Sequence, residues 1–372
     1  MGKSSRAGLL AVATVLGLAV APQAVAAPRH GITRISTTAA GAQSATASAG
    51  GTVSADGHYA VYGTKGPGGE GCPTAYGWCV FVKDLRTGKT VQVPGTGVEA
   101  YDPMISGDSS KVGYTSGTYH FFRAKVYDRR TGTLQTLWPT DPPKDNWYER
   151  SDLTGLSADG RYAAYTIGNR DGNANTAHLL VRDLTTGTDE VVDQPGHPGY
   201  LGGGRLSADG RYVAYSAQGS GVSALYVKDR RTGRTRSIGI PAGGGASVVD
   251  ISADGRHVLF DFGASYPGTT VQTYLADSRT GRAVPVGPEG ATALALDPTG
   301  RYALLKDSAG ALRLLDIRTG RRRTVAPSAA AATAVPGAVT RHGRTVVFTS
   351  AAPDLVPDDT NGVSDVFARG LG

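Results

Sequence analysis

The stretch LSADGRYVAYSA (206–217) decides the fold, because variants of this motif are repeated along the chain. Close copies are LSADGRYAAYTI (156–167), VSADGHYAVYG (53–63) and ISADGRHVLFDF (251–262), and looser copies are ISGDSSKVGYTS, LDPTGRYALL and VTRHGRTVVF. The aligned turn positions recur at intervals of 43 to 52 residues and are Gly57, Ser109, Gly160, Gly210, Gly255, Gly300 and Gly343. Recurrence at such a period predicts an array of similar structural units.

A second phrase, Asp-x-x-Thr-Gly, follows each of the first six copies. It is spelled KDLRTGKT, YDRRTGTL, RDLTTGTD, KDRRTGRT, ADSRTGRA and LDIRTGRR, starting at Lys83, Tyr127, Arg182, Lys228, Ala276 and Leu315. Asp-Gly favours a tight two-residue hairpin with the glycine at positive φ, and the Asp before Thr-Gly can accept from backbone N–H groups of its turn. We therefore assign the repeated residues, such as Asp56, Asp159, Asp209 and Asp254, to architecture and not to catalysis.

Each repeat is predicted to hold four short strands, which in the fourth repeat cover 205–207, 212–216, 224–228 and 235–238. The second of them, YVAYS, is apolar on both faces, as in a sheet packed between two neighbours. A period of about 40–50 residues with four strands per unit is typical of a β-propeller blade. The sequence thus predicts an all-β fold, a seven-bladed β-propeller of four-stranded antiparallel blades.

The two ends of the chain complement each other. The seventh repeat stops at Gly372 without a fourth strand, whereas ITRIST (32–37) resembles the strands that follow the Thr-Gly turns, such as TRSIGI. We expect 32–37 to pair beside 365–368 as the outer strand of the last blade. Such pairing closes the ring and removes an open sheet edge.

The first 26 residues have the pattern of a cleaved secretory signal: Lys3 and Arg6, a short apolar run, then Ala-Val-Ala. The prediction is a secreted or cell-envelope protein whose single propeller domain spans 27–372. The formal charge of +7 is scattered over repeated turns and falls to +5 without Lys3 and Arg6, so no basic helical face for nucleic acid is expected. We also expect a monomer without a membrane span.

The chain has two cysteines, Cys72 and Cys79. Both follow the signal in a chain bound for an oxidising compartment, so a disulfide is predicted. It would fasten a loop without making the fold.

The SADG-[RH]-[YH] and D-x-x-TG phrases resemble the TolB-like propeller repeats, a WD-repeat-like family of secreted bacterial proteins. The resemblance covers about 31–372. It implies a protein-binding scaffold in the cell envelope. The best-known member has an additional N-terminal domain, for which the segment between Ala27 and Val53 is too short.

The turns between first and second strands, and between third and fourth, are short and uniform. The loops on the opposite face differ from blade to blade, and we call that face the variable face. Function usually resides in such loops on a rigid scaffold. The loop 139–152 offers Trp147, Tyr148, Glu149 and Arg150 as a sugar or peptide platform, with packing between blades 2 and 3 as the alternative. The disulfide loop 65–77 adds Tyr76.

Two loops carry oxygen-rich side chains. The loop 168–176 begins like a calcium loop but lacks the Gly and Glu of that motif. The loop 353–365 is the better candidate for calcium; the alternative is an Asx-rich turn. Its predicted ligands are Asp354, Asp358, Asp359, Asn361 and Asp365.

Catalytic motifs are sparse. No G-x-S-x-G nucleophile motif occurs, and of the seven His only His120, His178 and His197 are expected near the variable face. The sequence favours non-catalytic binding of a protein, or of an envelope or extracellular polymer. The alternative is a propeller lyase or hydrolase acting on carbohydrate or lactone with a channel-bound metal.

Overall fold

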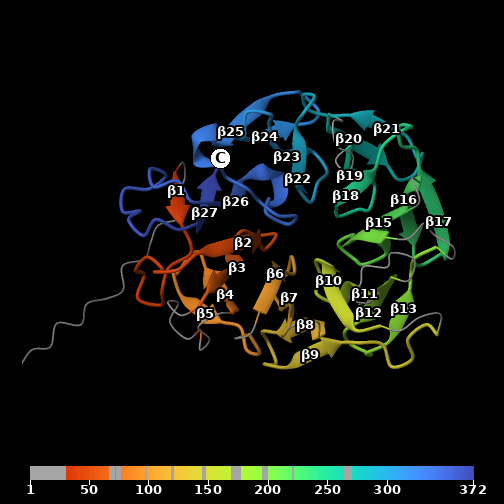
Figure 1. The fold of residues 1–372 in the computed structure, drawn as a ribbon, viewed down its shortest axis with the longest axis horizontal. Helices are drawn as coiled ribbons and strands as arrows, with labels where there is room; N and C mark the ends of the chain where they lie inside the picture. Colours follow the sequence, from red (N-terminus) through yellow and green to blue (C-terminus); the bar gives the residue numbers. More distant parts are fainter. Residues whose placement is uncertain are drawn as a thin grey trace, which may run out of the picture.

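The computed structural model describes residues 31–66, 72, 77–96, 99–118, 121–144, 148–168, 177–194, 200–219, 222–263 and 270–372. The predicted signal, 1–26, lies outside the described residues. The strands form seven sheets arranged in a ring (Figure 1), and every neighbouring pair of strands within a sheet is antiparallel. In the part of the chain that is described, no helix has the length and apolar character needed to cross a bilayer.

Six sheets have four strands in sequence order. Blades 1 to 3 are β2 (Ser48–Val53), β3 (Tyr59–Lys65), β4 (Trp78–Asp84), β5 (Thr90–Gln92); β6 (Glu99–Ile105), β7 (Lys111–Thr118), β8 (Phe121–Asp128), β9 (Leu134–Leu137); and β10 (Arg150–Leu156), β11 (Tyr162–Gly168), β12 (His178–Asp183), β13 (Asp189–Val191). Blades 4 to 6 are β14 (Tyr200–Leu206), β15 (Tyr212–Gly219), β16 (Val222–Asp229), β17 (Arg234–Ile238); β18 (Ala246–Ile251), β19 (His257–Phe262), β20 (Gln272–Asp277), β21 (Ala283–Pro285); and β22 (Thr292–Leu296), β23 (Tyr302–Lys306), β24 (Leu312–Asp316), β25 (Arg322–Ala326). The predicted seven-bladed propeller is confirmed.

The seventh blade joins the two ends of the chain. It consists of β26 (Thr345–Ser350), β27 (Asp365–Gly370) and β1 (Ile32–Arg34), in the order β1-β27-β26, with Val339 bridging to Val346 on the inner side. β1 lies antiparallel to β27, with Arg34 opposite Phe367. Closure by an N-terminal strand is therefore confirmed, although regular pairing ends at Arg34.

The SADG turn is longer than the predicted two-residue hairpin, since residues 207–211 separate β14 from β15 in blade 4. Its own side chains hold it. In blade 4 the Ser207 hydroxyl donates to Asp209 Oδ1 (2.8 Å) and accepts from the Tyr212 N–H (2.9 Å), while Asp209 accepts from the Arg211 N–H (3.0 Å). Gly210 has φ +67°, a conformation that costs a glycine little. The same contacts form around Ser54, Ser157 and Ser252.

The same turns also connect one blade to the next. The Ala158 N–H donates to the Ala208 carbonyl (2.9 Å), and the Ala208 N–H donates to the Ala253 carbonyl (2.9 Å). The approach is closest between blades 2 and 3, where a Cβ on Gly107 would lie 2.7 Å from the Ala158 Cβ. The repeated motif thus shapes each turn and links neighbouring blades.

The core lies in the seams between blades. One position on the second strand of successive blades carries a large side chain that is almost fully buried: Tyr62, Tyr114, Tyr165, Tyr215, Phe260, Leu305 and Phe348. Buried hydroxyls need partners. The Tyr114 hydroxyl donates to the Pro94 carbonyl (2.7 Å), and the Tyr165 hydroxyl donates to Asp189 (2.7 Å). Sheets buried on both faces account for the apolar YVAYS strand.

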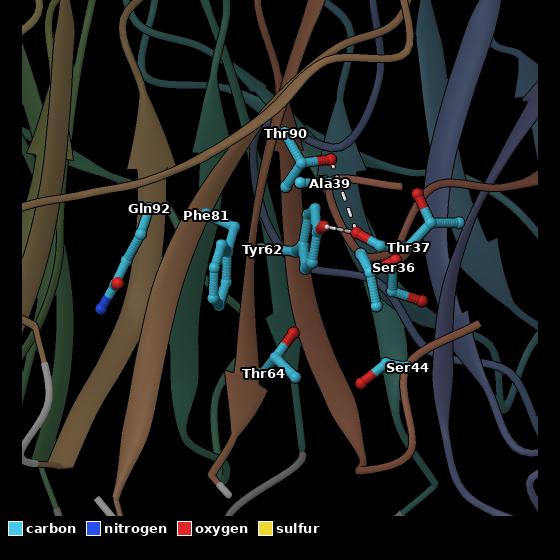
Figure 2. Close-up of a pocket in the computed structure, with 10 residues that line it drawn as sticks. Ser36, Thr37, Ala39, Ser44, Tyr62, Thr64, Phe81, Thr90 and Gln92 are labelled. Atoms are coloured by element: carbon cyan, nitrogen blue, oxygen red, sulfur yellow. Dashed lines mark hydrogen bonds between the residues drawn. The ribbon is translucent and has the colours of Figure 1, made fainter. Parts of the chain in front are cut away.

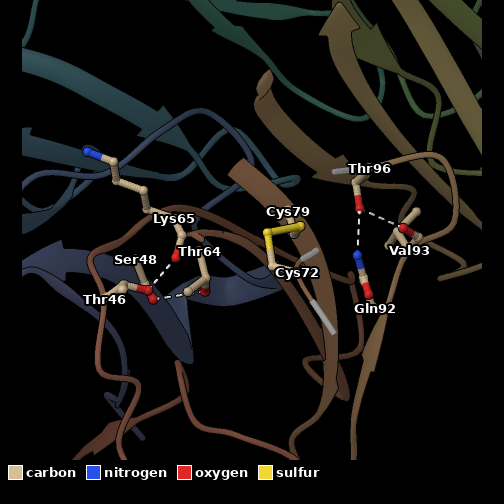
Figure 3. The surroundings of a disulfide bond; sticks show 9 residues. All are labelled: Thr46, Ser48, Thr64, Lys65, Cys72, Cys79, Gln92, Val93 and Thr96. Atoms are coloured by element: carbon tan, nitrogen blue, oxygen red, sulfur yellow. Dashed lines mark hydrogen bonds between the residues drawn. A yellow bond between two sulfur atoms is a disulfide. The ribbon is translucent and has the colours of Figure 1, made fainter. Parts of the chain in front are cut away.

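The predicted disulfide between Cys72 and Cys79 is confirmed, with a Cα–Cα distance of 5.7 Å. Figure 3 shows the bridge. Cys79 lies on β4 and is fully buried. Nearby, the hydroxyls of Ser48 and Thr64 are hydrogen-bonded across β2 and β3 (2.9 Å). The bridge therefore anchors the chain before β4 to the interior of blade 1.

Candidate binding face and central channel

The predicted aromatic platform is only partly described. Trp147 and Tyr76 lie outside the described residues. Tyr148 is 8% exposed and belongs to the hydrophobic cluster between blades 2 and 3, where its ring meets His178 edge-on at 5.9 Å. The Tyr148 ring is thus occupied in packing, which was the alternative interpretation of this loop.

Glu149 and Arg150 are partly exposed at the entrance to β10. The Arg150 guanidinium donates to both carboxylate oxygens of Asp152 (2.7 and 2.5 Å) and lies 5.3 Å from the Phe122 ring centroid. A planar guanidinium suits both contacts, since it forms paired hydrogen bonds and stacks on aromatic faces. These contacts orient Arg150 beside the central channel.

A cavity of about 700 Å³ lies in the channel, lined by inner strands of several blades. The polar or aromatic lining side chains are Thr52, Trp78, Tyr101, Asp102, Arg150, Asp152, Thr154 and Arg205. The inner strands β2, β6, β10 and β14 supply most of them, and their first residues lie on the side of the variable face. Polar groups from several blades therefore converge on one chamber.

Arg205 bridges blades 3, 4 and 5 across this chamber. Each inner strand of blades 1 to 6 has a β-bulge or similar irregularity, where one residue, or two in blades 1 and 2, has no partner in the ladder. In blades 3 and 5 those residues are Thr154 and Val249. Arg205 donates to both of their carbonyls, at 3.0 Å for Val249. The guanidinium therefore satisfies groups that the bulges leave unpaired.

Two carboxylates, Asp102 and Asp250, lie close enough to Arg205 for its charge to act on them. Asp250 accepts from the Leu296 N–H (3.1 Å) and the Ile251 N–H (2.9 Å). Burial raises the pKa of Asp250 and of Asp102, and the positive charge of Arg205 opposes that effect in both. Asp102 has φ +50°, a left-handed conformation that Asp tolerates better than most residues. The positive charge of Arg205 at the centre of the ring thus partly compensates the negative charges of Asp102 and Asp250.

Three aromatic side chains lie on β6 and β8 of blade 2, and one of them, Tyr101, lines the chamber. We call Tyr101, Phe121 and Phe122 the aromatic patch; Phe121 and Phe122 are successive residues of β8 and therefore point to opposite faces of the sheet. Phe121 is 64% exposed and begins β8, and Tyr101 is 37% exposed. The rings of Tyr101 and Phe122 lie 5.4 Å apart, and the Tyr101 hydroxyl donates to Glu99 (2.5 Å). Exposed aromatic side chains beside a cavity are typical of binding surfaces.

The aromatic patch and the Arg205 bridge were not predicted from the sequence. Two residues before the Ser of each first turn, the blades have Thr52, Met104, Gly155, Arg205, Asp250, Ala295 and Ala338. Only Arg205 and Asp250 in that series carry a charge. This contrast with the other blades could have indicated a special role for these two positions. The aromatic patch was hidden because Phe121 and Phe122 read as an ordinary strand.

The predicted calcium ligands are divided. Asp359 and Asp365 are buried around the Arg34 guanidinium (3.4 and 3.2 Å), and Asn361 donates to Asp365 (3.1 Å), whereas Asp354 and Asp358 are exposed. His178 is hydrogen-bonded to Asp193 (3.0 Å); His120 and His197 lie outside the described residues. Within the described ranges, no group of three or more His, Cys, Asp or Glu side chains is arranged to hold a metal ion.

Comparisons with known proteins agree on the fold. No family model matches the chain, and no curated protein matches it. Two solved oligogalacturonate lyases are similar in structure. One, in complex with manganese, has 15% sequence identity and a TM-score of 0.62, and the other, from Vibrio parahaemolyticus, has 16% identity and a TM-score of 0.63. Each match covers 92% of this chain and 93% of the lyase. TolB from Acinetobacter baumannii is 16% identical with a TM-score of 0.50, covering 74% of this chain and 65% of TolB.

At these identities the likeness establishes the β-propeller fold and nothing more. It includes a TolB-like neighbour, as the resemblance of the repeats implied, but the repeat family itself is not established. The neighbours are a lyase and a TolB protein, so the choice between catalysis and binding depends on this chain's own residues.

Proposed function

We propose that this protein is an exported, non-catalytic binding protein. It holds a protein, or an envelope or extracellular polymer, on the variable face, where the aromatic patch and Arg150 form the contact surface. Glu149, the neighbour of Arg150 in the sequence, completes this contact surface. The signal at 1–26 and the disulfide between Cys72 and Cys79 support export.

The observation that carries this proposal is the contrast between the chamber and its rim. In the chamber, Arg205 is held by two carbonyls and lies close to two carboxylates. At the rim, Phe121 exposes 64% of its surface. Aromatic side chains give large contact area at low entropic cost, so the rim is suited to a large partner.

The test is capture of ligand from culture supernatant and from an envelope polymer preparation by the immobilised mature chain. The variants Phe121→Ser and Tyr101→Ala should retain less than about a tenth of the captured material, because an aromatic hot spot of an interface is worth about 2 kcal/mol or more. Val191→Ser is the matched control, since Val191 is 44% exposed on the outer strand β13. Equal capture by all three variants would refute the proposed surface.

A second candidate function is a lyase acting on acidic saccharides. It is favoured by the presence of Arg150, Arg205 and Tyr101 in the lining of one chamber of about 700 Å³. Guanidinium groups recognise carboxylates, and aromatic rings stack on sugars. Incubation with oligogalacturonate and Mn²⁺ should then release unsaturated products, and Arg205→Met should lose that activity. Absence of product from the folded wild-type chain would leave binding as the function.

The predicted calcium site stays a proposal for the loop 353–365. Its test is melting with and without Ca²⁺. Any shift should vanish in Asp358→Asn if Asp358 is a ligand.

A further inference from the structure

A second pocket, of about 390 Å³, lies at the seam where the ring is closed. Its walls come from β1, from the segment after it, and from the ends of β4 and β27. Ile35, Ala39, Leu85 and Ala368 make much of it apolar. The charged side chains in the lining are Lys83 and Arg34, and the lining includes no acidic residue.

Lys83 is the unusual residue of this pocket. It lies on β4, is 8% exposed, and its ammonium group donates to the Thr37 hydroxyl. Among the described residues, no carboxylate forms an ion pair with Lys83, whereas Arg34 is paired with Asp359 and Asp365. A buried ammonium without a counter-charge is costly. Burial accordingly lowers the pKa of Lys83 to about 8.

The partner of Lys83 is held in place from the other side. The Thr37 carbonyl accepts from the Tyr62 hydroxyl (3.3 Å) and from the Thr90 hydroxyl (3.5 Å), as Figure 2 shows. Tyr62 itself stacks on Phe81 with ring centroids 6.0 Å apart. Thr37 therefore presents its hydroxyl to Lys83 from an anchored backbone. The ammonium group is pre-positioned at the pocket wall.

We propose that this pocket binds a small carboxylic acid with an apolar body. The carboxylate would take hydrogen bonds from Lys83 Nζ and the Thr37 hydroxyl, and the apolar body would lie against Ile35, Leu85 and Ala368. The ligand supplies the counter-charge that the protein lacks at Lys83, so its binding recovers the cost of burying the ammonium group. The site is separate from the variable face, since it includes the turn residues Gly57 and Gly88.

The test measures binding of sodium benzoate and sodium hexanoate by calorimetry, with benzyl alcohol as the uncharged analogue. Wild type should bind both acids, and Lys83→Met should bind them at least about tenfold more weakly, which is about 1.4 kcal/mol. Lys228→Met is the matched control, because Lys228 has the same place in the Asp-x-x-Thr-Gly phrase of blade 4 and lines no part of this pocket. Binding should also weaken as the pH rises through about 8, where the ammonium loses its proton.

A second measurement uses the wild-type chain alone. Benzoate should slow acetylation of Lys83 by acetic anhydride, read by peptide mass spectrometry, while Lys144, whose side chain is 84% exposed, reacts at an unchanged rate. No binding by wild type, equal binding by Lys83→Met, or unprotected acetylation of Lys83 would each overturn the proposal.

Discussion

Arg211 donates two hydrogen bonds to Asp229, from Nε to Oδ1 (2.9 Å) and from Nη2 to Oδ2 (2.7 Å). Arg211 follows the first repeated turn of blade 4, and Asp229 begins the second. The ion pair thus joins the two phrases of one repeat. The same relationship recurs as Arg161–Asp183, Arg256–Asp277, Arg301–Asp316 and, with lysine, Lys111–Asp128. In blade 1 the equivalent residue, His58, pairs instead with Asp56.

This relationship makes acid stability depend on the repeats. The Arg211 guanidinium lowers the pKa of Asp229 from 3.8 to about 2, so the pair stabilises the fold fully above about pH 4 and ceases to do so as the pH falls through about 2. We expect Arg211→Gln to melt below wild type at pH 7, with the difference shrinking between about pH 4 and pH 2. Thermal melts of both proteins across that pH range measure the difference. Arg231→Gln, on the same turn, is the control. A difference independent of pH would contradict the role given to the ion pair.

The repeated turns were predictable because their contacts are local. Ser207, Asp209 and Tyr212 lie within a few residues of one another, so the position of the turn could be predicted from the repeated phrase, although the hydrogen bonds of Ser207 were not. The link from Ala158 to Ala208 was less visible, since it joins residues of neighbouring blades. Both depend on residue types that recur, and recurrence is what a single sequence reveals best.

A second prediction concerns the closing strand. Arg34 lies between Asp359 and Asp365 at 3.4 and 3.2 Å, and all three side chains are almost fully buried. Removing one partner of a buried ion pair leaves uncompensated charge and typically costs about 3–5 kcal/mol. Arg34→Met should therefore lower the free energy of unfolding in urea by about that amount. Arg344→Met, at an exposed position of the same blade, should change it little.

Deleting residues 32–37 should have a larger effect than Arg34→Met, because it also opens the edge of β27 and promotes aggregation. Unchanged melting and solubility after the deletion would contradict the closure mechanism.

A third prediction concerns packing between blades 2 and 3. Gly113 lies on β7, and a Cβ there would lie 2.3 Å from the Leu153 Cδ2. Blades 3 and 4 have Ala164 and Ala214 at the equivalent position, so the restriction is specific to this seam. Gly113→Ala should cost about 1–3 kcal/mol by overpacking, measured by urea unfolding. Gly168→Ala is the control, because no atom lies within 4 Å of its added Cβ.

The candidate sites were less predictable than the fold, for a physical reason. Arg205 meets the carbonyls of Thr154 and Val249 only because a ring places three bulges around one axis. Lys83 is buried only because 35–41 folds back over blade 1. Spacing along one blade says nothing about side chains that meet across blades. The calcium prediction likewise rested on acids close in sequence, two of which are paired with Arg34 from the other end of the chain.

The fourth prediction concerns Asp261, a buried carboxylate at the seam of blades 5 and 6. It is 7% exposed, accepts from the Thr273 hydroxyl (2.7 Å) and accepts from the Ala293 N–H with both oxygens (3.0 Å). Burial raises its pKa to about 6, so between its ordinary 3.8 and 6 the folded state holds more protons than the unfolded state. Stability therefore falls as the pH rises through that window, by about 2–3 kcal/mol from this group.

Asp261→Asn keeps an acceptor for the Ala293 N–H and cannot ionise. We therefore expect its stability, relative to wild type, to increase by about 2–3 kcal/mol between about pH 4 and pH 6.5 and to stay level above that. Urea unfolding at a series of pH values measures the difference, and Asp358→Asn, at an exposed position, serves as the reference. Parallel curves for Asp261→Asn and wild type would mean that Asp261 ionises in the folded protein as it does in the unfolded chain.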